Sequence, residues 1–309
     1  MLSVEKTLYF RGQPIDCSPQ AFGLLRPSDE VLSDPSELRQ RFAEDGYLYI
    51  PKLLNRDDLL AARQTILERL ADLGYLDPDY SVSAGVAKPE FNKTFMPELA
   101  QDNQALMKVL YSGPMITFYE HFLGGPILHF DYTWFRAKTA GPETATQPHY
   151  DIVYMGRGTK KLCTSWTPLG DVPMTMGGLM ILENSHRLDQ VKATYGQIDV
   201  DEYCTNYADA EEIESGQKQW QRSDGGAYST DAIATRQTLG GRWLTTDYQL
   251  GDVLIFGMYT MHASLDNQTN QFRLSSDSRY QLASEPADER WIGASPIGHG
   301  LASKRGMIC

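Results

Sequence analysis

The chain has 309 residues, of which 41% are hydrophobic, 22% are charged and 11% are aromatic. This composition is typical of a globular protein and excludes disordered or collagen-like chains, while the length suits one large domain or two ordinary ones. The formal net charge of -12 argues against a nucleic-acid-binding protein, because phosphate contacts need clustered lysine and arginine side chains.

Neither the apolar runs nor the cysteines indicate a membrane protein or a disulfide-rich one. The longest apolar runs, such as residues 253–256, are far shorter than the roughly 20 residues of a membrane helix. The cysteines are scattered without a C-x-x-C pair, at Cys17, Cys163, Cys204 and Cys309. We therefore expect a soluble, cytoplasmic protein with reduced thiols and no membrane partner.

The first part of the chain predicts an irregular segment and then helices. Residues 1–35 are rich in proline and glycine and predict an irregular leader on the surface. Next, Leu38 and Phe42 lie at helical spacing before Gly46, and an apolar run follows at 47–50, so we expect a helix, a turn and a strand.

Two more helices are predicted before the character of the sequence changes. Residues 55–73 carry an apolar stripe, and Asn55 is a suitable N-terminal cap. A third helix is expected over 97–110, ahead of a Gly-Pro turn at 113–114.

From residue 127 onward, short β-rich runs alternate with turn residues. These runs are 127–137, 161–167, 179–182, 252–256 and 272–280. Helices followed by strands predict an α+β protein whose mainly β core is a sandwich or barrel of antiparallel sheets, braced by the N-terminal helices.

The predicted domain covers residues 36–285 and contains one long insertion. Residues 187–240 are polar and rich in acids, which indicates either a lid or a solvated surface excursion. Residues 286–309 are expected to form an irregular C-terminal tail.

The motif Pro148-His149-Tyr150-Asp151 is the first candidate for metal binding. On an extended strand, residues two apart project to the same face, so His149 and Asp151 can hold one ion together. A distant imidazole would complete a two-histidine, one-carboxylate triad, which suits non-haem iron(II) and leaves coordination positions open. His262, which follows a short apolar strand, is the candidate for that third ligand.

Arg273 lies on the next predicted strand after His262. A planar guanidinium binds a carboxylate through two hydrogen bonds and stays charged when it is buried. Beside a metal site, Arg273 is the expected anchor for the distal carboxylate of an oxo-acid cosubstrate.

The sequence resembles the phytanoyl-CoA dioxygenase family of iron(II) and 2-oxoglutarate-dependent oxygenases, over roughly residues 42–280. The motifs that carry the resemblance are, in order, FAEDGYLYIP, PHYD, SWTPLGDVPMTMGGLMILENSHR, GDVLIFGMYTMHAS and RLSSDSRY. The resemblance implies a double-stranded β-helix, which is a jelly-roll or cupin-like barrel. It also implies that His149, Asp151 and His262 are iron ligands and that Arg273 binds the 5-carboxylate of 2-oxoglutarate.

The resemblance implies four further contacts with the cosubstrate. Ser264, in the HAS triplet, matches a family position that contacts the cosubstrate. Tyr150 should point away from the metal, yet its position in the family lies close to the cosubstrate. Trp166 matches an aromatic position near the active site, although an ordinary core tryptophan is the alternative. Lys93, in FNKTF, falls in the region where the family has a lysine for the cosubstrate.

The implied reaction oxidises a small organic metabolite, most simply by hydroxylation, while 2-oxoglutarate and O2 are converted to succinate and CO2. Asp151 favours hydroxylation over halogenation, because related halogenases have glycine or alanine in place of the carboxylate. Residues 187–240, 84–94 and 138–147 are expected to line or cover the substrate. Candidate contacts flanking the metal motif are Arg136, Tyr154 and Arg157.

Two alternatives remain open. A divalent-metal hydrolase would use the same histidine and aspartate ligands, but it would not need Arg273 aimed at a cosubstrate carboxylate. A non-catalytic small-molecule-binding protein of the same barrel class could also retain the motifs. The expected partner is a small molecule rather than nucleic acid, and both a monomer and a homodimer are compatible with the sequence.

Overall fold

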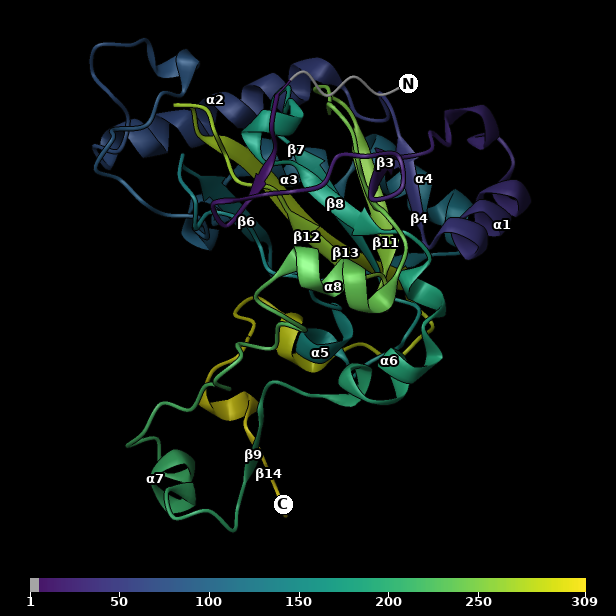
Figure 1. The fold of residues 1–309 in the computed structure, drawn as a ribbon, viewed down its shortest axis with the longest axis vertical. Helices are drawn as coiled ribbons and strands as arrows, with labels where there is room; N and C mark the ends of the chain where they lie inside the picture. Colours follow the sequence, from purple (N-terminus) through teal and green to yellow (C-terminus); the bar gives the residue numbers. More distant parts are fainter. Residues whose placement is uncertain (1–5) are drawn as a thin grey trace.

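The computed structural model describes residues 6–309, and its core is two β-sheets that face each other (Figure 1). The larger sheet has the order β4-β11-β7-β13-β5, with β6 also paired to β13. Its strands are β4 (Tyr47–Ile50), β5 (Ile127–His129), β6 (Trp134–Lys138), β7 (Cys163–Pro168), β11 (Val253–Gly257) and β13 (Arg273–Leu282). All its pairings are antiparallel.

The smaller sheet has the order β12-β8-β10-β3. Its strands are β3 (Phe22–Leu24), β8 (Leu179–Leu182), β10 (Trp243–Thr245) and β12 (His262–Ser264). Side chains from the two inner faces form one apolar cluster, in which Trp166, Leu254 and Phe256 from the larger sheet meet Leu179 and Ile181 from the smaller one. Because side chains alternate along each strand, this packing decides which residues point into the space between the sheets.

Helices cover the outer face of the larger sheet. They are α1 (Pro35–Asp45), α2 (Arg56–Asp72), α3 (Gln104–Tyr111) and α4 (Gly113–Leu123), and their apolar sides share a core with the outward residues of the strands. The Asn55 side chain accepts hydrogen bonds from the first backbone amides of α2, and Gly46 ends α1 in the left-handed conformation at φ 77°. The first two predicted helices and the strand after Gly46 are therefore confirmed.

The third helical prediction is wrong in one respect. Residues 97–110 contain a short 3-10 turn, Pro97–Ala100, followed by α3, and the Gly113-Pro114 pair does not form a turn between elements. It begins α4, because proline lacks an amide hydrogen and is tolerated at the first positions of a helix.

Residues 6–35 are not the irregular surface leader that the sequence predicts. Strands β1 (Tyr9–Phe10) and β2 (Gln13–Pro14) form a hairpin, and β3 pairs in parallel with β10 at the edge of the smaller sheet. Phe10 and Phe22 are buried. The part of the leader that covers residues 1–5 lies outside the described residues.

The expected α+β class with a sheet-rich core is confirmed. The closed jelly-roll barrel is not: over the described residues the pairings give separate open sheets. None of the helices within residues 6–309 is long and apolar enough to cross a membrane.

The insertion and the C-terminal tail are joined to each other. Strand β9 (Glu202–Cys204) pairs in parallel with β14 (Arg305–Met307), and Figure 1 shows these strands, with α7 (Ala210–Glu214), extending away from the sheets. Cys204 and Cys309 form a disulfide with their Cα atoms 5.5 Å apart. The expectation of four reduced thiols is thus wrong, because 105 positions separate two cysteines that the fold brings together.

We expect alkylation of the denatured, unreduced protein to modify only Cys17 and Cys163, the two free cysteines. After reduction, Cys204 and Cys309 should also react, since a disulfide has no thiolate to attack the reagent. Intact-mass spectrometry before and after reduction measures both numbers. Modification of all four cysteines without reduction would contradict the pairing.

Candidate metal centre and pocket

His149 and His262 are direct neighbours in space. Each donates its backbone amide hydrogen to the other's carbonyl oxygen, at 3.1 and 3.2 Å. Asp151 has φ -64° and ψ -26°, which is a helical conformation, and it immediately precedes the short helix α5 (Ile152–Met155). The prediction that His149 and Asp151 share one face of an extended strand is therefore wrong, although the turn still brings their side chains together.

The three predicted metal-binding side chains form one buried cluster. A ligand atom from each of His149, Asp151 and His262 lies within 4.8 Å of the others. The Nε2 atoms of both histidines are 3.7 Å from Oδ1 of Asp151. This donor set, with two imidazoles and one carboxylate, fits a mononuclear iron centre.

Hydrogen bonds orient both imidazole rings. Nδ1 of His149 lies 2.7 Å from the carbonyl oxygen of Gln147, and Nδ1 of His262 lies 3.0 Å from that of Thr260. A carbonyl oxygen only accepts, so each Nδ1 carries the hydrogen, and each Nε2 keeps its lone pair for a metal.

The second carboxylate oxygen of Asp151, Oδ2, contacts Arg279 and Thr164 rather than the histidines. Nη2 of Arg279 lies 3.2 Å from Oδ2, and the Thr164 hydroxyl donates to the same atom. Burial alone would raise the pKa of Asp151, but Arg279 and the two histidines outweigh it and hold that pKa below its usual range. The Asp151 side chain is therefore a charged carboxylate, and its Oδ1 atom faces the two histidines.

Burial keeps the histidines uncharged. It lowers the pKa of His149 to about 3, with His262 adding to the effect, and it also lowers the pKa of His262. At neutral pH the cluster thus holds one carboxylate and two neutral imidazoles, which is the protonation state that metal ligands require.

We expect Thr164→Val and Arg279→Gln each to weaken metal binding about 10- to 100-fold, because groups that orient a metal ligand typically contribute that much. Thr164→Ser keeps the hydroxyl and should bind like the wild type. Calorimetric titration with cobalt(II), which does not oxidise in air as iron(II) does, measures the affinity. Equal affinities for the valine and serine variants would contradict the role of Thr164.

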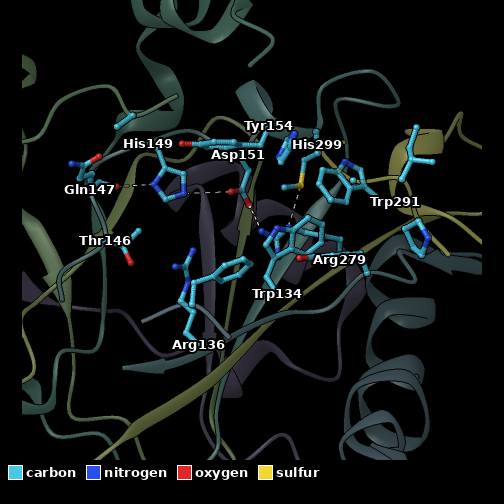
Figure 2. Close-up of a pocket in the computed structure, with 17 residues that line it drawn as sticks. Trp134, Arg136, Thr146, Gln147, His149, Asp151, Tyr154, Arg279, Trp291 and His299 are labelled. Carbon is cyan, nitrogen blue, oxygen red and sulfur yellow. Dashed lines mark hydrogen bonds and ion pairs between the residues drawn. The ribbon is translucent and has the colours of Figure 1, made fainter. Parts of the chain in front are cut away.

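A cavity of about 520 Å³ opens beside the cluster (Figure 2). His149 and Asp151 are part of its wall, and Thr146 and Gln147 line it from the predicted segment 138–147. The insertion contributes Ala227. The C-terminal tail contributes Trp291, Pro296, Ile297, Gly298 and His299.

Deeper between the sheets lie two buried cations. Arg273 on β13 and Lys138 on β6 are cross-strand partners, and each is 1% exposed. The Arg273 guanidinium donates to the Ser275 hydroxyl, and its Nε has no hydrogen-bond partner. Lys138 donates to Ser264 Oγ at 2.7 Å and to the carbonyl oxygen of Leu265 at 2.8 Å.

Neither cation has a carboxylate within ion-pair distance among residues 6–309. Burial lowers the pKa of Arg273 to about 9 and lowers the pKa of Lys138 well below its ordinary value. A buried cation without a counter-ion is costly, so this end of the space between the sheets favours an anionic ligand.

Two of the four further residues predicted from the family resemblance lie at this end. Ser264 accepts the hydrogen bond from Lys138, and the Trp166 ring centre is 5.7 Å from the Arg273 guanidinium. Tyr150 points away from the metal cluster, as expected, but it packs against Tyr195 and donates its hydroxyl hydrogen to the carbonyl oxygen of Ser185. It does not line the cavity.

Lys93 is exposed, and the buried lysine is Lys138 instead. Lys93 lies in a loop, within the short motif FNKTF, and a contact between its side chain and the cosubstrate stays a prediction. The alternation of β6 carries the missed signal: Trp134, Arg136 and Lys138 are two apart and share one face.

Of the expected substrate contacts, Arg136 and Tyr154 line the cavity, whereas Arg157 does not. Nor do residues 84–94, although the adjacent Phe95 does. Sequence reasoning missed Arg279, Trp134, Trp291 and His299. Arg279 is six residues after Arg273 on the same strand, so the period of two could have revealed it.

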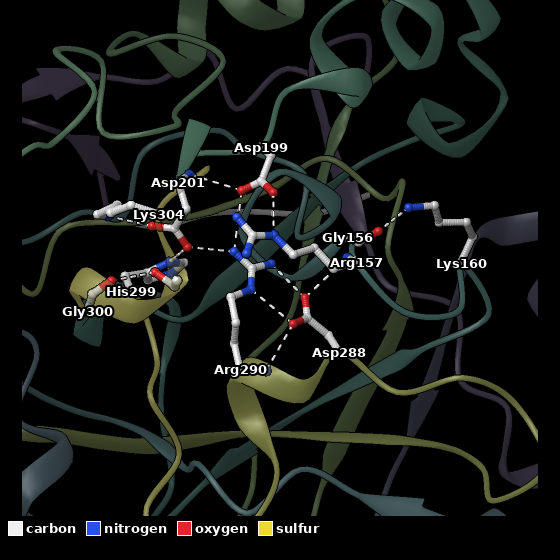
Figure 3. Close-up of polar contacts among 11 residues, drawn as sticks. Gly156, Arg157, Lys160, Asp199, Asp201, Asp288, Arg290, His299, Gly300 and Lys304 are labelled. Carbon is white, nitrogen blue, oxygen red and sulfur yellow. Dashed lines mark hydrogen bonds and ion pairs between the residues drawn. The ribbon is translucent and has the colours of Figure 1, made fainter. Parts of the chain in front are cut away.

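A network of ion pairs fastens the tail beside the cavity (Figure 3). Arg290 is the centre of the network and pairs with Asp201 at 2.5 Å and Asp288 at 2.6 Å. Asp201 also lies 2.9 Å from His299 and 2.6 Å from Lys304. Since His299 and its neighbours line the cavity, the network links the insertion to the cavity wall.

We expect acid to weaken this network. Burial would raise the pKa of Asp201, but hydrogen bonds from His299 and Lys304 outweigh it and lower that pKa below its ordinary value of 3.8. The unfolded chain therefore binds this proton first, so the stabilisation present at neutral pH is lost as the pH falls from about 5 toward 3.

Denaturant unfolding at several pH values measures the effect. Wild type should lose up to about 1.4 kcal/mol of unfolding free energy per pH unit more than Asp201→Asn does in that range. Asp189→Asn, whose carboxylate is 93% exposed, is the control and should follow the wild type. Parallel curves for wild type and Asp201→Asn would contradict the role of Asp201.

The two-histidine, one-carboxylate cluster in this sheet-rich fold has the donor set of a mononuclear non-haem metal centre. A family model described as phytanoyl-CoA dioxygenase (PhyH) matches residues 42–275, which is more than half of the chain. The chain belongs to the phytanoyl-CoA dioxygenase family.

Curated relatives include two hydroxylases. The 1-deoxypentalenic acid 11-beta-hydroxylase of Streptomyces exfoliatus is 26% identical over 279 residues, which is 87% of this chain and 85% of the relative. The enzyme of the same name from Streptomyces arenae is 25% identical over 178 residues, which is 56% of this chain and 58% of that protein.

Solved structures with a similar fold include two enzymes of nogalamycin biosynthesis. The non-heme alpha ketoglutarate dependent carbocyclase SnoK matches with a TM-score of 0.57 at 16% identity, over 85% of this chain and 90% of that chain. The epimerase SnoN matches with a TM-score of 0.53 at 18% identity, over 85% of this chain and 93% of that chain. At these identities the likeness shows the fold alone.

Proposed function

We propose that the protein is an iron(II) and 2-oxoglutarate-dependent dioxygenase that hydroxylates a small organic metabolite. The observation that carries this proposal is the cluster of His149, Asp151 and His262. Three donor atoms converge from oriented, buried side chains, and a cavity opens beside them. These three residues would hold iron(II), and the donor set leaves coordination positions for the cosubstrate and O2.

The cosubstrate would lie between the metal cluster and the two buried cations. Arg273 would bind the 5-carboxylate of 2-oxoglutarate through its guanidinium, with Lys138 adding a second positive charge. Ser264 is two residues after His262 on β12, an offset of roughly 7 Å along a strand, which suits the length of a five-carbon dicarboxylate. Trp166 would support the Arg273 guanidinium from its ring face.

When bound, iron(II) supplies the activation of O2 that oxidises 2-oxoglutarate to succinate and CO2 and hydroxylates the substrate. The chain itself binds and orients. Thr164 and Arg279 fix the direction of the Asp151 carboxylate, and the backbone carbonyl groups of Gln147 and Thr260 fix the imidazoles. The tail and the insertion limit the access of water to the cavity.

We also propose that the two facing sheets are the halves of a double-stranded β-helix with the metal cluster toward one open end. The shared inner core of the two sheets supports this architecture. Hydroxylation of a small molecule is supported by the name of the Streptomyces exfoliatus relative, which describes hydroxylation of an organic acid.

The alternatives explain less of the site. A hydrolase would need the metal cluster but would leave Arg273 and Lys138 as buried cations without a purpose. A non-catalytic binding protein would not need three oriented donor atoms with their lone pairs directed to one point.

Calorimetry tests the proposed function without a known substrate. Cobalt(II)-loaded protein should bind 2-oxoglutarate at least tenfold more tightly than succinate, because only 2-oxoglutarate has an oxo group that can chelate the metal. Removing the metal should abolish the difference. Equal binding of the two acids by the loaded protein would contradict the proposal.

A further inference from the structure

The cavity beside the metal cluster narrows the class of substrate. We propose that the substrate is a mostly apolar, ring-bearing acid whose carboxylate binds Arg136. This inference rests on the proposed function, since it concerns the substrate of the same site. It follows from the aromatic wall of the cavity and from the hydrogen bonds that Arg136 does and does not make.

Three aromatic rings form a rigid apolar wall. The ring centres of Trp134 and Trp291 are 4.7 Å apart, and Tyr132 lies 4.7 Å from Trp134 and 5.3 Å from Trp291. Phe95 and Ile297 also line the cavity and are 42% and 47% exposed. Such flat, preformed surfaces bind ring systems at a small cost in conformational entropy.

Arg136 supplies the charged donor in this apolar setting. It lies on β6 with its side chain 24% exposed, and its Nε donates to Oδ2 of Asp277 at 3.3 Å. No hydrogen bond to its two Nη groups occurs within residues 6–309. Figure 2 shows the guanidinium directed into the cavity, toward His149 and Asp151. Its two Nη groups are therefore available for a carboxylate.

The other charged groups of the cavity are already engaged. Arg279 pairs with Asp151 and lies 4.4 Å from the Trp134 ring centre. His299 hydrogen-bonds to Asp201 at 2.9 Å. The carboxylate of Asp151 faces the two histidines, so it would bind the metal rather than the substrate. Arg136 is thus the cavity group best placed to select an anionic substrate.

The cavity volume fits this class. About 520 Å³ is within the usual range for sites that enclose small organic ligands. A charge-assisted hydrogen bond in a partly enclosed site contributes more than a neutral one, so replacing the carboxylate by an amide of the same shape should cost at least tenfold in affinity.

Two probes of matched shape test the proposal. Adamantane-1-carboxylate and adamantane-1-carboxamide differ in charge but share a compact ring system, and calorimetry on the metal-free full chain measures both. We expect the wild type to bind the carboxylate at least tenfold more tightly. If it binds neither probe, or binds both equally, the proposal is overturned.

Variants test whether Arg136 is the residue responsible for the preference for the carboxylate over the carboxamide. Arg136→Gln should bind the carboxamide like the wild type but lose the preference for the carboxylate. The double variant Arg136→Gln/Asp277→Asn should behave in the same way, and it leaves no carboxylate unpaired if the single variant folds poorly. Arg56→Gln, at an exposed position at the start of α2, should retain the preference. A preference that survives in both Arg136 variants would overturn the proposal.

This test is separate from that of the proposed function, because it uses no metal and no 2-oxoglutarate. A charge preference with no metal-dependent 2-oxoglutarate binding would support the role of Arg136 and contradict the oxygenase. If Arg136→Gln instead weakens 2-oxoglutarate binding while the acid preference is intact, Arg136 serves the cosubstrate, and the inference about the substrate is wrong.

Discussion

Replacing His262 with alanine is expected to weaken iron(II) binding by more than about a hundredfold and to abolish the oxidation of 2-oxoglutarate. Groups that merely orient a ligand contribute about 10- to 100-fold to metal affinity, so the loss of a ligand should exceed that range. His262 is 4% exposed, and its Nε2 is 3.7 Å from Oδ1 of Asp151. Anaerobic competition with a coloured iron(II) chelator measures the affinity.

Two further variants make this result specific. His121→Ala removes an exposed histidine far from the cluster in sequence and should bind iron(II) like the wild type. His262→Gln fills most of the space of the imidazole beside Phe256, whose ring centre is 4.4 Å away, and should lose iron(II) without a packing defect. Wild-type affinity in both His262 variants would contradict the assignment.

The second large effect is expected for Arg273→Gln. The affinity of the metal-loaded protein for 2-oxoglutarate should fall about a hundredfold, because a charge-assisted pair contributes about 1.5 to 3 kcal/mol and tenfold in affinity is about 1.4 kcal/mol. Metal affinity should stay within about threefold of the wild type, since Arg273 makes no hydrogen bond or ion pair with the three metal-binding side chains within residues 6–309. Calorimetry with cobalt(II) and then 2-oxoglutarate measures both quantities.

The same variant should not destabilise the metal-free protein. Arg273 is buried without a carboxylate partner, so replacing it with a neutral side chain removes a desolvation cost. Arg290→Gln is the matched control: it breaks a buried network of ion pairs and should lower the free energy of unfolding by about 3 to 5 kcal/mol. Equal destabilisation of the two variants would contradict the view that Arg273 is an unpaired cation whose function is to bind an anionic ligand.

Local patterns in the sequence were sufficient to predict most of the helices and strands. Helices α1 and α2 follow from apolar spacing and from the capping residues Asn55 and Gly46, and β8 follows from a short apolar run. The leader could not be predicted in this way. Strand β3 exists because residues distant in sequence, in β10, offer it backbone hydrogen bonds.

The candidate metal site was predictable because His149 and Asp151 are only two positions apart in sequence and His262 follows a recognisable strand. Their local conformation was not, since Asp151 is in a helical turn rather than a strand. Lys138 and Arg279 lie at even spacing on their strands, and the strand register then pairs Lys138 with Arg273 and places Arg279 opposite Thr164.

The wall formed by the tail was beyond sequence reasoning for a different reason. Trp291 and His299 reach the cavity because Arg290 and the disulfide at Cys204 fasten the last part of the chain to the insertion. Ion pairs and disulfides between segments about a hundred positions apart leave no periodic pattern in either segment.

The most direct test of the account is anaerobic titration of the metal-free protein with iron(II) and 2-oxoglutarate, followed by visible spectroscopy of wild type, His149→Ala and Arg273→Gln. Chelation of iron(II) by 2-oxoglutarate produces a weak charge-transfer band. The account predicts the band in the wild type, its loss in His149→Ala, and its appearance only at much higher 2-oxoglutarate concentration in Arg273→Gln. A wild-type protein that binds iron(II) but never develops the band would contradict the dioxygenase.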